Sequence, residues 1–157
     1  MPSRIISTAG AVLMLATLIA PGVRAESAGD FNQIDGVALH GFDPVAYFTQ
    51  NRALKGEAQF TAEYRGVTYE FNSKENQAAF QANPAKYVPQ YGGFCAFAVS
   101  KGVKADIDPH AFAINDGKLF VNYSDKALQA YQQDVKGNTE NANHNWPEVV
   151  KQSKIIR

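Results

Sequence analysis

Residues 62–99, AEYRGVTYEFNSKENQAAFQANPAKYVPQYGGFCAFAV, carry the strongest structural signals in the chain. Apolar and polar side chains alternate on both sides of Arg65-Gly66, which is typical of two strands joined by a tight turn. Ser73 is suited to cap a helix that runs to Asn83-Pro84, because proline cannot continue a helix that has already formed. This stretch therefore predicts a β-hairpin followed by a short helix.

The segments on either side predict more elements of the same kind. Asp43-Pro44 is suited to begin a short helix, with aspartate as the cap and proline at the first helical position. The sequence AFAINDGKLFVNYS predicts a second hairpin around Asn115-Asp116-Gly117. A helix should follow from Ser124 to Gly137, and a last helix should begin at Pro147.

These elements indicate a small single domain of the α+β class, with an antiparallel sheet built from hairpins and short packed helices. The stretch FCAFAV fits either a buried helix or a buried strand. His110 follows Asp108-Pro109 and is expected at the start of a helix. No internal repeat is discernible in the sequence.

The first 25 residues have the features of a secretory signal peptide. Arg4 is followed by an apolar run from Ala9 to Ala20, and Val23-Arg24-Ala25 offers small residues at a cleavage site. The apolar run is too short for a membrane span, which needs about 20 residues. We therefore expect a periplasmic or secreted protein, cut near Ala25, with no membrane span in the mature chain.

The division of the chain follows from these signals. We expect a signal peptide at residues 1–25, an N-terminal lead at 26–40, one domain with a C-terminal helical extension at 41–150, and a tail at 151–157. The slightly acidic balance of the mature chain argues against nucleic acid as a partner.

Several motifs resemble the YHS domain family. The resemblance rests on an Asp-Pro-Val start, an aromatic hairpin, and a helix that ends in Phe-x-x-x-Pro-x-x-Tyr. The matching residues are Asp43, Pro44 and Val45; Tyr64, Gly66, Tyr69 and Phe71; and Phe80, Pro84 and Tyr87. YGGFCAFAV and the later hairpin are similar to an exported, bacterial-type YHS subfamily. The resemblance implies metal handling, copper first.

This sequence departs from the cysteine pattern of that family. Ala46 and Asn72 stand where cysteine-bearing relatives have cysteine, and a further helix cysteine is also missing. A multi-cysteine site therefore does not carry over. Cys95, His40 and His110 remain as a thiolate-plus-imidazole set suited to copper or zinc. The alternatives are a buried, apolar Cys95 and two solvated histidines.

A binding module for a small organic ligand, or for a protein partner, is the second hypothesis. Asp43, Tyr47 and Tyr91 are its candidate pocket residues, because aromatic rings with phenol groups suit an apolar pocket that has polar handles. Tyr64, Tyr69 and Phe94 are further aromatic residues that could line the same pocket, and the alternative for most of these rings is the hydrophobic core. The alternative for Asp43 is a helix cap, which would contribute about 1 kcal/mol.

Catalytic patterns are weak by comparison. No phosphate loop, nucleophile elbow or paired-carboxylate signature is present, and the lone Cys95 has no second cysteine for redox exchange. We therefore favour a binding protein over an enzyme. Its partner would be a metal ion or a small ligand, and the sequence names no protein partner.

The first prediction concerns the mature N-terminus. We expect the exported protein to begin at Glu26, because the small residues before it suit a signal peptidase. Intact-mass analysis of the exported protein measures this directly. Recovery of the uncut chain in the membrane fraction would contradict it.

Overall fold

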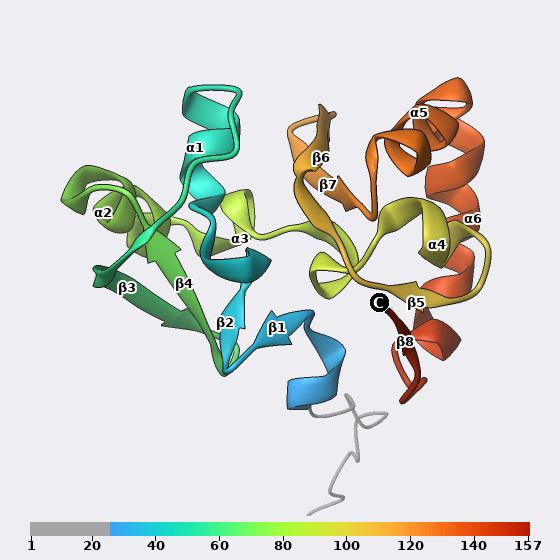
Figure 1. Cartoon of the computed structure of the whole chain (residues 1–157), viewed down its shortest axis with the longest axis horizontal. Coiled ribbons are helices and arrows are strands. Elements are labelled where there is room, and N and C mark those ends of the chain that lie inside the picture. The colour runs from blue at the N-terminus through green and yellow to red at the C-terminus, as the bar shows by residue number, and fades with distance from the viewer. Residues whose placement is uncertain (1–25) are drawn as a thin grey trace, which may run out of the picture.

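A β-hairpin followed by a serine-capped helix occurs twice in the structure, once in each half of the chain (Figure 1). The structure is a computed structural model that describes residues 26–157. The predicted signal peptide, residues 1–25, lies outside the described residues. In Figure 1 the first hairpin and helix occupy one side of the molecule, and the second pair occupies the other.

The first half contains one four-stranded sheet. Its elements are η1 (Ala28–Asp30), β1 (Gln33–Ile34), β2 (Val37–Ala38), η2 (Leu39–Gly41), α1 (Pro44–Thr49), β3 (Glu57–Tyr64), β4 (Val67–Phe71), α2 (Lys74–Ala82) and α3 (Pro84–Tyr87). The strand order is β1-β2-β4-β3, with β2 parallel to β4 and the other neighbours antiparallel.

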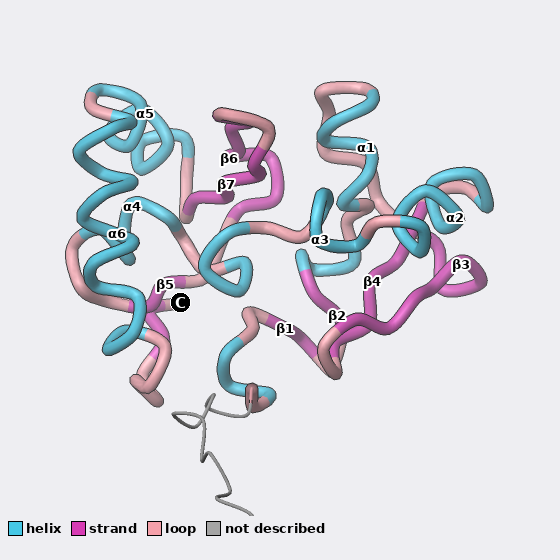
Figure 2. Tube along the Cα trace, turned by 180° about the vertical axis from the view of Figure 1, so that it is seen from behind, coloured by secondary structure: helices cyan, strands magenta, loops and turns pink. Residues whose placement is uncertain are grey.

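The second half contains two strand pairs and the longest of the described helices. Its elements are η3 (Gln90–Gly93), α4 (Ala96–Ser100), β5 (Lys104–Ala105), β6 (Asp108–Asn115), β7 (Lys118–Asn122), α5 (Asp125–Gln133), α6 (Val135–Val149) and β8 (Ile155–Ile156). β6 is antiparallel to β7, and β5 is parallel to β8. Helices α4, α5 and α6 gather beside the β6–β7 hairpin (Figure 2). The last seven residues, expected as a tail, thus contain strand β8.

The two hairpins share one pairing register, including an irregularity at the same place. In the first, the register shifts between Glu57 and Thr61, which pair with Phe71 and Glu70. In the second, it shifts between Asp108 and Phe112, which pair with Asn122 and Val121. A parallel bridge recurs as well: Val37 with Thr68, and Pro89 with Leu119. The second half therefore repeats the backbone pairing of the first.

The turns that lead into α1 and α4 match in the same way. Three consecutive residues with positive φ precede each turn: Leu39, His40 and Gly41 in the first half, and Tyr91, Gly92 and Gly93 in the second. A phenylalanine and a capping residue follow, Phe42-Asp43 and Phe94-Cys95. Cys95 thus occupies the position in the second half that Asp43 occupies in the first.

The structure contains an internal repeat, so our expectation from the sequence that there is none is wrong. The backbone bonds recur while most side chains differ, as at Asp43 and Cys95. Residues that keep both identity and role are few; they include the turn glycines Gly66 and Gly117 and the caps Ser73 and Ser124. A repeat kept mainly in backbone geometry leaves little trace in sequence.

One hydrophobic core joins the halves, so the repeat forms a single domain. Val45, Tyr69 and Phe71 from the first half belong to the same buried cluster as Leu119 and Val121 from the second. The α+β class and the antiparallel hairpins are therefore confirmed. A second cluster, centred on Phe94, Phe120 and Tyr131, lies within the second half.

Of the predictions for single elements, the helix caps are confirmed and one helix start is wrong. Asp43, Ser73 and Ser124 cap helices as predicted, and FCAFAV contributes to helix α4. His110 is an exposed residue of strand β6, so the predicted helix start there is wrong. None of the helices in residues 26–157 is long and apolar enough to cross a membrane.

The C-terminal helix begins earlier than predicted. Asp134 caps α6, and its Oδ1 accepts a hydrogen bond from the Gly137 amide at 2.9 Å. Gly137 therefore lies in the first turn of α6 instead of ending α5, and a side chain at this position would collide with the Asp134 carboxylate. Pro147 lies inside the last part of α6 and does not start it.

The second prediction concerns the buried Asp43 carboxylate. Oδ1 accepts from the amides of Val45 and Ala46, and Oδ2 accepts from the Asn72 amide and Asn76 Nδ2. Asp43→Ala should cost about 3 kcal/mol of unfolding free energy, because it orphans buried donors from three segments. The cost of about 1 kcal/mol expected from a helix cap alone is therefore too small.

Ser73→Ala is the matched control for Asp43→Ala. Its hydroxyl accepts one bond, from the Asn76 amide, so its loss should cost about 1 kcal/mol. Denaturant melts of both variants test the difference. Equal losses would contradict a cross-linking role for Asp43.

Candidate ligand-binding cleft

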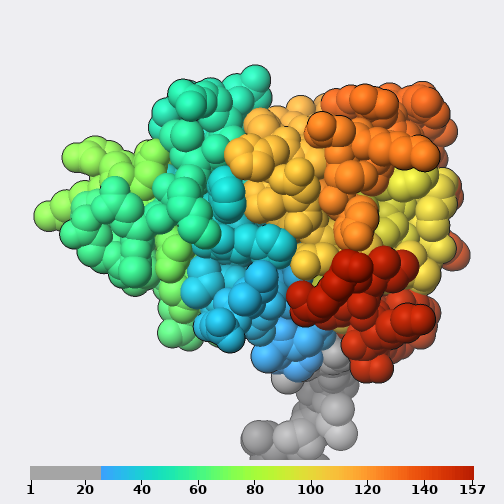
Figure 3. All heavy atoms as spheres, in the orientation of Figure 1, coloured from blue at the N-terminus to red at the C-terminus, as the bar shows by residue number. Residues whose placement is uncertain are grey.

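A cleft of about 310 Å³ lies between the two halves of the chain. It is lined by side chains from the first hairpin turn, the connection between the halves, helix α6 and the N-terminal segment. These residues are Glu26, Asp30, Phe31, Tyr64, Arg65, Tyr69, Val88, Pro89, Gln90, Tyr91, Gly92, Trp146 and Val150. In Figure 3 the N-terminal residues, in blue, lie between the green first half and the red C-terminal segment.

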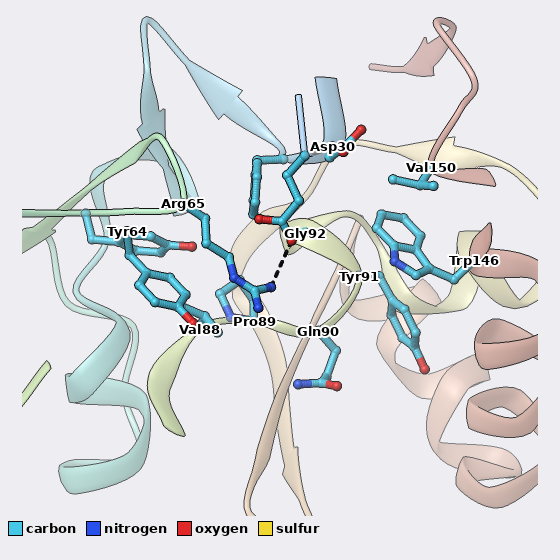
Figure 4. A pocket seen from close by; sticks show the side chains of 13 residues that line it. Asp30, Tyr64, Arg65, Val88, Pro89, Gln90, Tyr91, Gly92, Trp146 and Val150 are labelled. Atoms are coloured by element: carbon cyan, nitrogen blue, oxygen red, sulfur yellow. Dashed lines mark hydrogen bonds and ion pairs between the residues drawn. The ribbon is translucent and has the colours of Figure 1, made fainter. Parts of the chain in front are cut away.

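Aromatic rings from both halves face this cleft. Tyr64 and Tyr69 come from β3 and β4, while Tyr91 comes from η3 and Trp146 from α6. Figure 4 shows Tyr64 and Arg65 at one side and Tyr91 and Trp146 at the other. The Tyr91 and Trp146 rings contact each other at 5.8 Å between centroids. The cleft thus has aromatic walls on two opposite sides.

The backbone around Tyr91 fixes one wall. Tyr91 has a φ of 53°, a value uncommon for residues other than glycine, asparagine and aspartate. Gly92 follows because an added Cβ would collide with the Asp30 carbonyl oxygen. The Asn32 amide donates to Gly92 O at 2.8 Å, and Asn32 Nδ2 donates to Gly93 O at 3.1 Å. These bonds hold the N-terminal segment against the connection between the halves.

Lys104 also holds the N-terminal segment in place. Its side chain is buried, and Nζ donates to the carbonyls of Gly29 at 2.7 Å and Val150 at 2.8 Å. The ammonium also lies 4.8 Å from the centroid of the Phe94 ring. Two walls of the cleft are therefore joined through one buried cation.

Arg65 and Glu26 form an ion pair within the cleft. Arg65 Nη1 lies 2.9 Å from Glu26 Oε1, and the side chains are 53% and 43% exposed. The Arg65 guanidinium carbon also lies 5.3 Å from the centroid of the Tyr64 ring. The other acidic residue, Asp30, accepts bonds from the amide and hydroxyl of Ser27 at 3.0 Å.

Two phenols of the cleft, those of Tyr69 and Tyr91, stay protonated at neutral pH. Burial raises the pKa of Tyr69 and of Tyr91 well above the ordinary value for tyrosine. The Tyr91 hydroxyl donates to Asn143 Oδ1 at 2.9 Å. The rings therefore offer neutral surfaces, and Arg65 and the two acids carry the charge.

Of the pocket residues predicted from sequence, Tyr64, Tyr69 and Tyr91 line this cleft. Phe94 lies in the second hydrophobic cluster, and Asp43 and Tyr47 also lie elsewhere. Asp43 is fully buried and bound to amides. Tyr47 is buried too, and its hydroxyl donates to the Pro109 carbonyl at 2.9 Å. Both residues serve the internal packing of the domain.

Cys95 is buried, as one of the alternatives from sequence held. It is 1% exposed, and its Sγ accepts a hydrogen bond from the Ala98 amide at 3.4 Å. Burial raises the pKa of the thiol, although backbone hydrogen bonds at Ala98, Tyr123 and Phe97 partly oppose this. The thiol thus caps α4 in the way that the Asp43 carboxylate caps α1.

The two candidate histidines have separate surroundings. His40 Nε2 lies 2.8 Å from Asp106 Oδ1, and His110 packs edge-on against Phe42. Burial raises the pKa of Asp106, but hydrogen bonds from Asn32, the Ile107 amide and His40 outweigh it, so this pKa lies below its ordinary value. Within residues 26–157, no three His, Cys, Asp or Glu side chains are grouped in a way that could hold a metal ion.

A second cavity, of about 380 Å³, lies at the corresponding place in the second half. The two hairpins and the helices that follow them supply its equivalent walls. Asn115, Asp116, Phe120, Thr139 and Glu140 stand where the cleft has Tyr64, Arg65, Tyr69, Val88 and Pro89. The repeat has therefore kept the hollow while its chemistry changed, with an aspartate in place of the arginine.

Sequence reasoning missed Glu26, Arg65 and Trp146 as site residues. They come from three segments that are distant in the chain, and Arg65 is noticeable in sequence only as part of a turn. Trp146 offers the one usable signal, since it is the sole tryptophan and stands in a polar segment.

The family model of the YHS domain matches residues 45–91. The chain contains a YHS domain. The match runs from α1 to η3, so it covers most of the first half and stops as the second begins. The aromatic residues Tyr64, Tyr69 and Tyr91 of the cleft lie within the matched YHS domain. No curated protein and no solved structure matches the chain.

The third prediction concerns the reactivity of Cys95. In the native protein a thiol reagent should label Cys95 at least tenfold more slowly than in the denatured protein, because the thiol is buried and its pKa is raised. Labelling is followed by mass, and Cys95→Ser serves as the unlabelled control. Equal rates in the two states would contradict a buried thiol.

Proposed function

We propose that this YHS-domain chain binds a small planar aromatic molecule in the cleft between its halves. The observation that supports this most is the pair of opposed aromatic walls, Tyr64 with Tyr69 and Tyr91 with Trp146. Offset stacking and edge-to-face contacts with such rings favour planar aromatic ligands. A volume of about 310 Å³ suits a compact ligand, at the small end of the usual range for binding pockets.

Pre-organisation supports the same proposal. The rings are attached to a hairpin, a helix and a backbone segment held by Asn32 and Lys104, so little freedom remains to be lost on binding. The left-handed Tyr91 adds to this, since unfavourable backbone conformations persist where surrounding structure holds them and are common at binding sites.

Transition-metal binding, copper first, is the second candidate. The match to the YHS domain favours it, because the family resemblance implies metal handling. The closest arrangement of suitable side chains is the half-buried His40–Asp106 pair, where an imidazole and a carboxylate meet at 2.8 Å. We propose for either function that the protein works in the periplasm or outside the cell, because residues 1–25 have the features of a signal peptide.

The fourth prediction tests the cleft with trans-cinnamamide, a neutral planar probe. Binding should change the fluorescence of Trp146, which is the sole tryptophan and lines the cleft. Tyr64→Ala should weaken binding about tenfold by removing one wall. Tyr123→Ala, which removes an exposed ring away from the cleft, should leave the affinity unchanged.

Calorimetric titration supplies the independent measurement. Absence of both a heat signal and a fluorescence change with cinnamamide and its analogues would contradict the small-ligand proposal. Titration with Cu(I) then tests the second candidate: stoichiometric binding that is lost in His40→Ala or Cys95→Ser would support a metal site.

A further inference from the structure

Arg65 is the one basic side chain among the residues that line the cleft. It stands in the tight turn between β3 and β4, and its guanidinium lies against the Tyr64 ring. Stacking on an aromatic face holds a guanidinium while leaving its N–H groups available in the plane. The turn thus presents a positioned donor group beside an aromatic wall.

The ion pair between the Arg65 guanidinium and its present partner, Glu26, is weak. Glu26 is 43% exposed and Arg65 is 53% exposed, and ion pairs between exposed side chains contribute about 0–1 kcal/mol. No other hydrogen bond or ion pair of the Glu26 side chain is found in the described part of the chain. A ligand anion that also gains stacking energy can therefore displace the Glu26 carboxylate.

The remaining charges around the cleft do not oppose an anion strongly. The Asp30 carboxylate accepts two hydrogen bonds from Ser27, which orient it and stabilise its negative charge. The Lys104 ammonium donates to carbonyls of Gly29 and Val150, and it adds positive charge behind the walls to which these residues belong. When a ligand anion displaces Glu26, Arg65 pairs with the ligand, and the released Glu26 carboxylate, which is 43% exposed, can be solvated by water.

We infer that the ligand of the cleft is a planar aromatic carboxylate whose anionic group replaces Glu26 on Arg65. A carboxylate can accept two parallel N–H bonds from a guanidinium, which a neutral amide cannot match. The inference rests on the proposed small-ligand function and names the class of its ligand. The repeat supplies a contrast, because Asp116 stands at the equivalent turn position in the second cavity and has no guanidinium with which to bind a carboxylate.

The test compares trans-cinnamate with trans-cinnamamide, which have nearly the same shape and differ in charge. Calorimetric titration of the purified protein should show cinnamate binding about tenfold more tightly than cinnamamide. Arg65→Gln should remove this preference by weakening cinnamate alone. Glu26→Gln should have the opposite effect and tighten cinnamate several-fold, because it removes the competing carboxylate. Lys118→Gln removes a basic side chain from the second cavity, and it should leave both affinities unchanged.

Each outcome separates the two proposals. Equal binding of both compounds, with no effect of Arg65→Gln, would overturn the carboxylate inference and leave the small-ligand function standing. Failure of both compounds to bind would overturn the small-ligand function, and the inference with it. Tighter cinnamate binding that Glu26→Gln weakens would show that Glu26 does not compete for Arg65, which also contradicts the inference.

Discussion

The buried carboxylate of Asp43 holds the first half of the molecule together. Its two oxygens accept hydrogen bonds from the start of α1, from Asn72 at the end of β4, and from Asn76 in α2. One side chain therefore sets the positions of two helices relative to the hairpin. The hairpin in turn carries Tyr64, Arg65 and Tyr69 to the cleft, so the geometry of that wall depends on an anchor placed elsewhere in the core.

In the second half, the helix that corresponds to α1 is α4, and a weaker hydrogen-bond acceptor, the Cys95 sulfur, caps it. Cys95 caps α4 through its sulfur, and the Asn122 carboxamide oxygen accepts from the Phe97 amide, so the amides are divided between two side chains. This cap buries no carboxylate, and the thiol adds to the apolar core. In the described structure, the lone cysteine therefore caps a helix and packs in the hydrophobic core. In that half, α6 also packs against α4.

The helices and strands could be predicted from the sequence more accurately than the way in which they pack together. Caps, tight turns and strand alternation are local signals, so Asp43, Ser73 and both hairpins could be identified from a few residues each. The extent of α6 could not, because Gly137 ordinarily ends a helix and here fits beside the Asp134 cap. The aromatic residues Tyr64, Tyr69 and Tyr91 of the cleft could be predicted from sequence. Glu26, Arg65 and Trp146 could not, because they are brought together by the packing of two halves whose repeat is hidden in sequence.

The divergence of the two halves explains why a ligand site should lie in one of them. Both hairpins create a hollow with the segment that follows their helix, so the fold supplies two equivalent cavities. In the first, that segment runs on through Gly92 and packs on Asp30, which closes the hollow with the N-terminal segment and with Trp146. In the second, the segment is the continuous helix α6, and Asn115 and Asp116 replace a ring and a cation. Aromatic rings on two sides and an arginine in the hairpin turn therefore coincide in the first cavity, where the chain also supplies an acidic residue to occupy Arg65 in the absence of ligand.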